Sequence, residues 1–271
     1  MPKLTTYIAN AFSAGAFTGN PAAVVPYCDA DGLDAPLMQA LAEQNNLAET
    51  AFVHLDGYTD GGYPLRWFTP AQEVRLCGHA TLASAYVLER FANELGMETD
   101  DALHFDTLSG RLSCRNDGGK WSMDFPADTP RAAPKLASVL GANSGDVFRG
   151  TDDALLVLPD AAAVRAYRPD DIAIRALRTR GLIISAPCDD DADFDVISRC
   201  FYPEFGIEED TATGSAHTLI GTYWSARLGK PALRCLQASR RRGVLGVRHD
   251  GGARVSLTGE VELYLVGKAY L

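Results

Sequence analysis

An internal repeat is the feature of this sequence that most constrains its fold. Phe68-Thr69-Pro70 leads through a polar loop into a helix-like segment at 78–91, and Phe201-Tyr202-Pro203 leads in the same way into a helix-like segment at 215–228. The two Phe-x-Pro marks lie 133 residues apart, close to half of the 271-residue chain. The repeat therefore predicts two lobes of similar build.

The two helix-like segments are apolar on nearly every side, which is typical of helices buried inside a protein. Their apolar residues are Leu82, Ala83, Ala85, Tyr86, Val87 and Leu88 in the first, and Leu219, Ile220, Tyr223, Trp224 and Ala226 in the second. Short strand-like segments, separated by turn signals such as Asp60-Gly61-Gly62, outnumber the helices. We expect an α+β fold in which each lobe is a mostly antiparallel, strand-rich layer wrapped around one buried helix.

The segment from Pro126 to Pro134 contains three prolines and is the best candidate for a linker between the lobes. The predicted boundaries are 1–125 for the N-terminal lobe and 126–258 for the C-terminal lobe. Within the latter we expect a helix from Asp170 to Arg180, closed by Gly181. Near the C-terminus, separate strands are expected at 255–257 and 261–266.

Charge and composition exclude several classes of partner and cofactor. With 35 acidic against 25 basic residues the net charge is −10, which argues against a nucleic acid as partner. No nucleotide-binding glycine motif is present, and no pair among the five histidines has a metal-ligand spacing, so we expect neither a cofactor nor a metal. The six cysteines form no C-x-x-C pair, and we find neither a signal-peptide profile nor a membrane-spanning apolar run. We therefore expect a cytoplasmic protein with reduced thiols and no membrane contact.

Glu49 lies where a helical pattern stops and a strand pattern begins. Upstream, Asp34 and Pro36 open a helix that Asn45 and Asn46 end, and downstream Ala51-Phe52-Val53 reads as a buried strand. A carboxylate among such apolar neighbours would be withdrawn from water, which disfavours its charged form and suits proton transfer. The alternative is a glutamate at a helix end that points to solvent.

Small residues at the starts of the two buried helices indicate an anion site. Gly78 and Ala80 in one helix, and Gly214 and Ser215 in the other, would leave the first backbone N–H groups uncovered. Such groups would hold a small carboxylate and stabilise negative charge that develops on carbon during proton removal. The alternative is that these residues are only good helix caps.

Three polar side chains beside these helix starts are candidates for chemistry. Cys77 is either a thiolate with a lowered pKa or a buried, inert thiol. His79 is either a second acid or base or a hydrogen-bonding group that fixes the substrate. Asp210 either binds an amine or hydroxyl of the substrate or caps the following helix.

The order of these motifs resembles that of the PhzF family of phenazine-biosynthesis-like proteins, which share the diaminopimelate epimerase fold. The resemblance spans essentially the whole chain and is carried by Gly19-Asn20-Pro21, Asn46-Leu47-Ala48-Glu49-Thr50, Phe68-Thr69-Pro70, Cys77-Gly78-His79-Ala80-Thr81 and Asp210-Thr211-Ala212-Thr213-Gly214-Ser215-Ala216. It implies two similar lobes, each a strongly curved sheet around a central helix, with the active site in the cleft between them. It also implies that the last strand, about 259–271, returns to the first lobe, and that the protein is a homodimer.

The family's characterised chemistry is a cofactor-free isomerisation in which one glutamate moves a proton between carbons of a dihydro-hydroxyanthranilate. The resemblance assigns that role to Glu49, with His79 and Asp210 at the substrate. It assigns binding of the small, anionic substrate to Gly78, Gly214 and Ser215; Thr213 and Cys77 lie beside these residues and are further candidates.

Two departures from the family pattern bear on the substrate. The phenazine enzymes have Ser immediately before the glutamate, where this chain has Ala48, and related epimerases use two cysteines where this chain has Cys77 and Thr211. Because Thr cannot supply a thiolate at neutral pH, a symmetric two-thiol racemase is not expected. Two alternatives to a Glu49 isomerase stay open: an epimerase that uses Cys77 with a different partner, and a non-catalytic binding module on the same fold.

Overall fold

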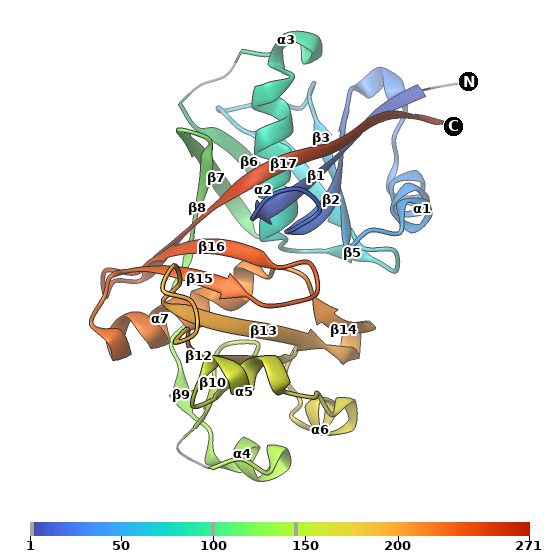
Figure 1. Cartoon of the computed structure of the whole chain (residues 1–271). Helices are drawn as coiled ribbons and strands as arrows, with labels where there is room; N and C mark the ends of the chain where they lie inside the picture. The colour runs from blue at the N-terminus through green and yellow to red at the C-terminus, as the bar shows by residue number, and fades with distance from the viewer. Residues whose placement is uncertain (1–2, 99–100, 144–145) are drawn as a thin grey trace. The chain divides into compact units, whose positions relative to one another are not determined.

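The computed structural model describes residues 3–98, 101–143 and 146–271 (Figure 1). The chain forms two compact units. One comprises Met1–Asp124 together with Thr258–Leu271, and the other comprises Phe125–Leu257.

The first unit contains one sheet that mixes antiparallel and parallel pairs. Strands β1–β2, β1–β17, β3–β4, β4–β5, β6–β7 and β7–β8 pair antiparallel, whereas β2–β3 and β4–β6 pair in parallel. The elements are β1 (Lys3–Ser13), β2 (Asn20–Tyr27), η1 (Asp29–Asp31), α1 (Ala35–Asn45), β3 (Glu49–His54), β4 (Tyr63–Phe68), β5 (Glu73–Val74), α2 (Gly78–Arg90), α3 (Ala92–Leu95), β6 (Leu103–Thr107), β7 (Gly110–Asp117), β8 (Lys120–Pro126) and β17 (Arg254–Tyr270).

The two faces of this sheet are covered by different helices. Val25 and Phe52 pack with Met38 and Leu41 of α1 in one cluster. Helix α2 contacts β1, β2 and β3, and most of its residues are buried, including Leu82. Because successive strand residues point to opposite faces, the apolar centre of β3, Ala51-Phe52-Val53, serves both helices. The expectation that the helix at 78–91 is buried is confirmed.

Local signals fix the segment that leads to Glu49. The Asp34 carboxylate accepts a hydrogen bond from the backbone N–H of Leu37 at 2.9 Å, and a proline lies in the first turn of α1. Asn46 ends the helix in the left-handed conformation, with φ of 48°. Three residues later β3 begins with Glu49, so the predicted helix-to-strand joint is confirmed.

The second unit also contains a mixed sheet. Strands β9–β10, β10–β11, β12–β13, β13–β14 and β15–β16 pair antiparallel, whereas β11–β12 and β13–β15 pair in parallel. The elements are β9 (Arg131–Ala132), α4 (Pro134–Leu140), β10 (Val147–Arg149), β11 (Ala154–Val157), α5 (Ala161–Ala166), α6 (Asp171–Ala176), β12 (Leu182–Pro187), β13 (Val196–Tyr202), η2 (Pro203–Phe205), β14 (Ile207–Asp210), α7 (Gly214–Leu228), β15 (Ala232–Gln237) and β16 (Gly243–Arg248).

Alternate residues of β12 serve the two faces of this second sheet. Ile184 belongs to the apolar cluster that includes Val164 of α5 and Ile174 of α6. The next residue, Ser185, accepts a hydrogen bond from Trp224 Nε1 of α7 at 2.9 Å. Helix α7 is buried along most of its length, as predicted.

The repeat in the sequence has a structural counterpart in each unit. Arg66 of β4 donates through Nε to Glu73 of β5 at 2.7 Å, and its guanidinium lies 5.1 Å from the Phe68 ring centroid. In the second unit Arg199 of β13 donates through Nε to Glu209 of β14 at 2.6 Å and lies 5.0 Å from the Phe201 ring centroid. In each unit the ion pair stabilises the polar loop that leads to the buried helix of that unit.

Two predicted elements differ in extent. The helix expected at 170–180 is only α6 (Asp171–Ala176), because Arg178 takes a φ of 53°, which no helix accommodates. The strands expected at 255–257 and 261–266 are one continuous strand, β17, in which Gly259 is accommodated against Phe12. Among the residues that the structure describes, we find no helix of sufficient length and hydropathy to cross a membrane.

Candidate active site

Glu49 and His79 form a buried contact within the first unit. Glu49 opens β3, and His79 is the second residue of α2. The Glu49 Oε2 atom lies 3.1 Å from His79 Nε2, with side chains only 16% and 8% exposed. Although the distance suits an ion pair, the two atoms are not aligned for a hydrogen bond, and neither has a hydrogen-bond partner among the described residues. The alternative of a Glu49 side chain that points to solvent is wrong.

Cys77 completes this first group. Its Sγ lies 3.6 Å from Nδ1 of His79, so the imidazole ring lies between the thiol and the carboxylate. Burial and the negative charge of Glu49 raise the pKa of Cys77, and they outweigh the effects of His79 and the Ala80 N–H. The thiol is therefore protonated at neutral pH, which favours the inert role over the thiolate role.

The charge state of His79 depends on its neighbours. Burial lowers its pKa, but the contact with Cys77 and the negative charge of Glu49 raise it by more, so that the pKa lies well above its ordinary value. We attribute the increase mainly to Glu49, because the Cys77 thiol is neutral. A protonated imidazole beside a carboxylate is a ready proton donor.

Glu49, Cys77 and His79 also have atoms of metal-ligand type within 4.8 Å of one another. Spacing among the histidines alone could not reveal this group, because Glu49 comes from a different segment of the chain. The thiol and the carboxylate, however, lie at opposite nitrogens of one imidazole ring. Since His79 would bind an ion through only one of these nitrogens, the present ring orientation suits a proton relay better than coordination by all three side chains.

The N-termini of the two buried helices lack side-chain caps. Neither Cys77, the N-cap of α2, nor Thr213, the N-cap of α7, accepts a capping hydrogen bond. Helices α1, α5 and α6 are all capped by aspartate. Helices α3 and α4 also lack a side-chain cap, so the missing cap is not unique to α2 and α7. It leaves the first N–H groups of α2 and α7 without an anionic side chain, as an anion site requires.

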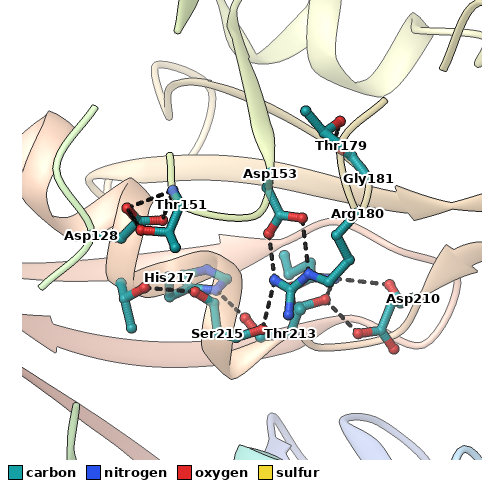
Figure 2. Close-up of polar contacts among 12 residues, drawn as sticks. Asp128, Thr151, Asp153, Thr179, Arg180, Gly181, Asp210, Thr213, Ser215 and His217 are labelled. Carbon is teal, nitrogen blue, oxygen red and sulfur yellow. Dashed lines mark hydrogen bonds and ion pairs between the residues drawn. The ribbon is translucent and has the colours of Figure 1, made fainter. Parts of the chain in front are cut away.

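Asp210 lies in a second group of polar residues, within the second unit (Figure 2). Its carboxylate accepts hydrogen bonds from the Thr213 hydroxyl and from the Thr211 backbone N–H. Gln237 fixes the same turn, since it donates to the Asp210 carbonyl at 2.8 Å and accepts from the Thr213 N–H at 2.7 Å. Asp210 therefore positions the cap residue of α7 instead of capping the helix itself.

Arg180 and Asp153 belong to this second group but were not predicted. The Arg180 guanidinium donates to both carboxylate oxygens of Asp153 and, through Nη2, to the Ser215 hydroxyl at 3.0 Å (Figure 2). Asp153 is 3% exposed. Asp153 directly precedes β11 and Arg180 lies two residues before β12, but no local sequence signal links positions 153, 180 and 215. Only the parallel pairing of β11 and β12 brings the first two together.

One expected correspondence is wrong. The sequence pattern places Thr211 opposite Cys77, yet the residue that precedes α7 as Cys77 precedes α2 is Thr213. From Phe68 to Cys77 the chain advances nine residues, and from Phe201 to Thr213 it advances twelve, because the second loop contains the extra turn η2. Both candidates are threonines, so a second thiol is absent in either case.

The sequence matches the family profile described as phenazine biosynthesis-like protein over residues 9–267. The chain belongs to this family. A relative named as an uncharacterized isomerase, from Pseudomonas aeruginosa, is 44% identical and is aligned over 99% of this chain and 100% of its own length. A crystal structure of a phenazine biosynthesis protein of the PhzF family, from Enterococcus faecalis, has a TM-score of 0.87 and 36% identity and covers 99% of this chain and 100% of its own.

A more distant likeness concerns the fold alone. The structure of a probable proline racemase from Agrobacterium radiobacter has a TM-score of 0.61 and 11% identity, covering 99% of this chain and 93% of its own. The expectation of an epimerase-like fold is thus confirmed.

Proposed function

We propose that this protein is a cofactor-independent isomerase that moves a proton between carbons of a small carboxylate substrate. The observation that carries the proposal is the contact between Glu49 Oε2 and His79 Nε2 at 3.1 Å, in which both atoms are buried and lack a hydrogen-bond partner among the described residues. Polar atoms left in this condition are costly for a folded protein, and they are expected where a substrate supplies the missing partners. The name of the Pseudomonas aeruginosa relative, an isomerase, supports the same class of reaction.

In the proposed reaction Glu49 removes a proton from carbon and returns it to a second carbon. The imidazolium of His79 donates a hydrogen bond and stabilises the negative charge that develops in between. The uncapped N-terminus of α2, beginning at Gly78, adds fixed positive dipoles. A positioned acid–base group contributes about 10²- to 10⁴-fold to the rate, and the remainder comes from electrostatic stabilisation and exclusion of water.

Asp210, Thr213, Gly214 and Ser215 are proposed to bind the substrate. Asp210 would accept from an amine or hydroxyl, and the uncapped N–H groups at the start of α7 would hold the carboxylate. Ala48 in place of the serine of the phenazine enzymes removes one hydrogen-bonding group, which favours a substrate other than the phenazine precursor.

Isotope exchange tests this proposal while the substrate is still unidentified. Wild-type protein and Glu49→Gln are incubated with a small-molecule extract in heavy water, and mass spectrometry identifies any carboxylate that gains deuterium. We expect gain with the wild type alone. Glutamine has the shape of glutamate without its basicity, so equal deuterium gain with both proteins would refute the assignment of Glu49. No gain with either, across extracts from several growth conditions, would favour the non-catalytic binding module.

The epimerase alternative rests on Cys77, which lies beside the same histidine. It requires a thiolate, whereas burial raises the pKa of this thiol. The Glu49 proposal is therefore preferred, and it predicts that loss of the Cys77 thiol leaves turnover largely intact.

A further inference from the structure

The internal repeat allows the contacts of the two units to be compared position by position. Thr50 of β3 pairs with Phe68, and Leu182 of β12 pairs with Phe201. The residue before Thr50 is Glu49, so its counterpart is Gly181, and Arg180 stands next to that position. Arg180 thus occupies in the second unit nearly the place that the proposed proton-transfer residue occupies in the first.

The partners of Glu49 and Arg180 also correspond. His79 is the second residue of α2, and Ser215 is the second residue of α7. Glu49 contacts His79, and Arg180 contacts the Ser215 hydroxyl at 3.0 Å. At matching places the first unit therefore presents an acid–base pair, whereas the second presents a cation and a hydroxyl at an uncapped helix N-terminus.

Arg180 is held in place and retains donors for a ligand. Its Nε and Nη2 groups are used by Asp153 and Ser215, but none of the hydrogen bonds among the described residues uses Nη1. The side chain is 32% exposed, whereas that of Asp153 is 4% exposed. A guanidinium that is clamped on one edge and open on another is preorganised for a carboxylate.

Tyr202 provides an independent sign of a missing ligand. It is 5% exposed, and its hydroxyl has no hydrogen-bond partner among the described residues. Its ring centroid lies 5.4 Å from the Arg180 guanidinium carbon, and burial together with the charge of Asp153 keeps its pKa well above the ordinary value. Gly181 allows this approach, because a Cβ there would lie 2.2 Å from the Tyr202 ring. The tyrosine therefore retains a proton to donate beside Arg180.

From this geometry we infer that Arg180 is a substrate-binding residue, which with Ser215, Tyr202 and the first turn of α7 holds the carboxylate of the substrate. Asp153 is a positioning residue that fixes the guanidinium. The inference rests on the proposed function, because it takes the bound carboxylate to belong to the substrate that is isomerised. It adds a charged side chain to the carboxylate-binding part of the site, for which the sequence predicted only the helix starts at Gly78, Gly214 and Ser215.

The test measures binding of benzoate, with uncharged benzamide as the matched control, by NMR titration of the arginine Nε–H signals. The Arg180 signal is assigned by its loss in Arg180→Gln. In the wild type we expect benzoate, but not benzamide, to shift it. Arg180→Gln should weaken benzoate binding about 10-fold or more, as expected for loss of a charge-assisted hydrogen bond, and Arg180→Lys should weaken it less.

Substitution of Asp153 separates binding from structural support. Asp153→Asn keeps only one of the two acceptors for Arg180, so the guanidinium is less firmly fixed and benzoate should bind more weakly than in the wild type but more tightly than in Arg180→Gln. The double variant Asp153→Asn with Arg180→Gln leaves no unpaired buried charge and should fold, yet should not bind benzoate. Benzoate affinity equal to wild type in a folded Arg180→Gln or double variant would refute the inference, as would the absence of benzoate binding by the wild type.

Failure of this inference differs from failure of the proposed function. Glu49→Gln should bind benzoate like the wild type, since Glu49 does not hold the carboxylate. If Glu49→Gln retains deuterium exchange while Arg180→Gln loses benzoate binding, the isomerase mechanism is wrong and the anion site stands. If instead Glu49→Gln loses deuterium exchange while Arg180→Gln binds benzoate like the wild type, the isomerase mechanism stands and Arg180 is not part of the site.

Discussion

The Nε2 atom of His79 lies 3.1 Å from Oε2 of Glu49, and both atoms are buried without another hydrogen-bond partner among the described residues. An acid and a base at this separation can transfer protons to and from a substrate that lies beside them. The arrangement makes Glu49 the most informative position to change. With Glu49→Gln we expect deuterium transfer to fall by about 10²- to 10⁴-fold. The thermal midpoint at pH 7 serves as the control for folding, and unchanged transfer in a folded variant would contradict the prediction.

The raised pKa of His79 predicts a specific pH dependence of stability. In the unfolded chain this histidine loses its proton near pH 6.5, whereas in the folded protein it keeps the proton to a higher pH. Its contribution to the free energy of unfolding is therefore complete below about pH 6.5 and is lost as the pH rises through the folded pKa. Urea denaturation from pH 6 to 9 measures this loss. Glu49→Gln removes the main cause of the raised pKa and should flatten the profile; an equally steep profile in the variant would contradict this attribution.

His217 predicts the opposite pH dependence. It is fully buried, donates through Nδ1 to the Thr213 carbonyl at 2.8 Å, and has its pKa lowered to about 4, chiefly by burial. Between about pH 6.5 and 4 the unfolded chain binds a proton that the folded chain does not, so the free energy of unfolding should fall by roughly 3 kcal/mol over that range. Asn can replace the Nδ1 donor but cannot titrate. His217→Asn should therefore remove this decrease, and a parallel decrease in wild type and variant would assign it to other groups.

Cys77 should be slow to react and dispensable for turnover. Because burial raises its pKa, we expect iodoacetamide at pH 7 to modify Cys77 far more slowly in the folded protein than in urea, as peptide mass spectrometry would measure. Cys77→Ser preserves a polar group beside His79 and should retain turnover within about 10-fold of the wild type, less than general acid–base catalysis contributes. A loss as large as that of Glu49→Gln would instead support the epimerase alternative.

Asp210 should affect binding as well as turnover. Its carboxylate orders the turn before α7 by accepting from Thr213 and Thr211. Asp210→Asn removes the charge that would accept from a substrate amine, and it replaces a charge-assisted contact worth about 1.5–3 kcal/mol. We expect a higher KM and a lower kcat for the substrate found by isotope exchange. Ser239→Ala, which removes a hydrogen bond to the Thr211 carbonyl of the same turn without touching the Asp210 carboxylate, is the matched control. Wild-type kinetics in Asp210→Asn would limit Asp210 to a structural role.

Features that depend on residues adjacent in the chain could be predicted from the sequence. Asp34, Pro36 and Asn46 set the ends of α1 through their own backbone preferences, and Glu49 falls at the start of β3 for that reason. The buried helices α2 and α7 could be found because an all-round apolar helix has no solvent face. Family membership followed from the order of such local motifs.

The loop before α7 could not be aligned from the sequence. The loop before α7 is three residues longer than the loop before α2, because it contains η2. The sequence pattern therefore aligned Thr211 with Cys77, although the residue in the corresponding place is Thr213. A loop length is set by how the turn packs, and here Gln237 from a distant strand fixes it through hydrogen bonds to Asp210 and Thr213. Nothing within the loop itself encodes that support.

The sequence by itself determined the family, the buried helices and the candidates Glu49, His79 and Asp210, because each depends on near neighbours along the chain. Tertiary structure alone decided that Glu49 contacts His79, that Asp210 holds Thr213, and that Asp153 clamps Arg180 against Ser215. These contacts join strands and helices distant in sequence, and their geometry follows from strand register and helix packing. The physical reason is that a side chain's charge state and free donors depend on what surrounds it in space.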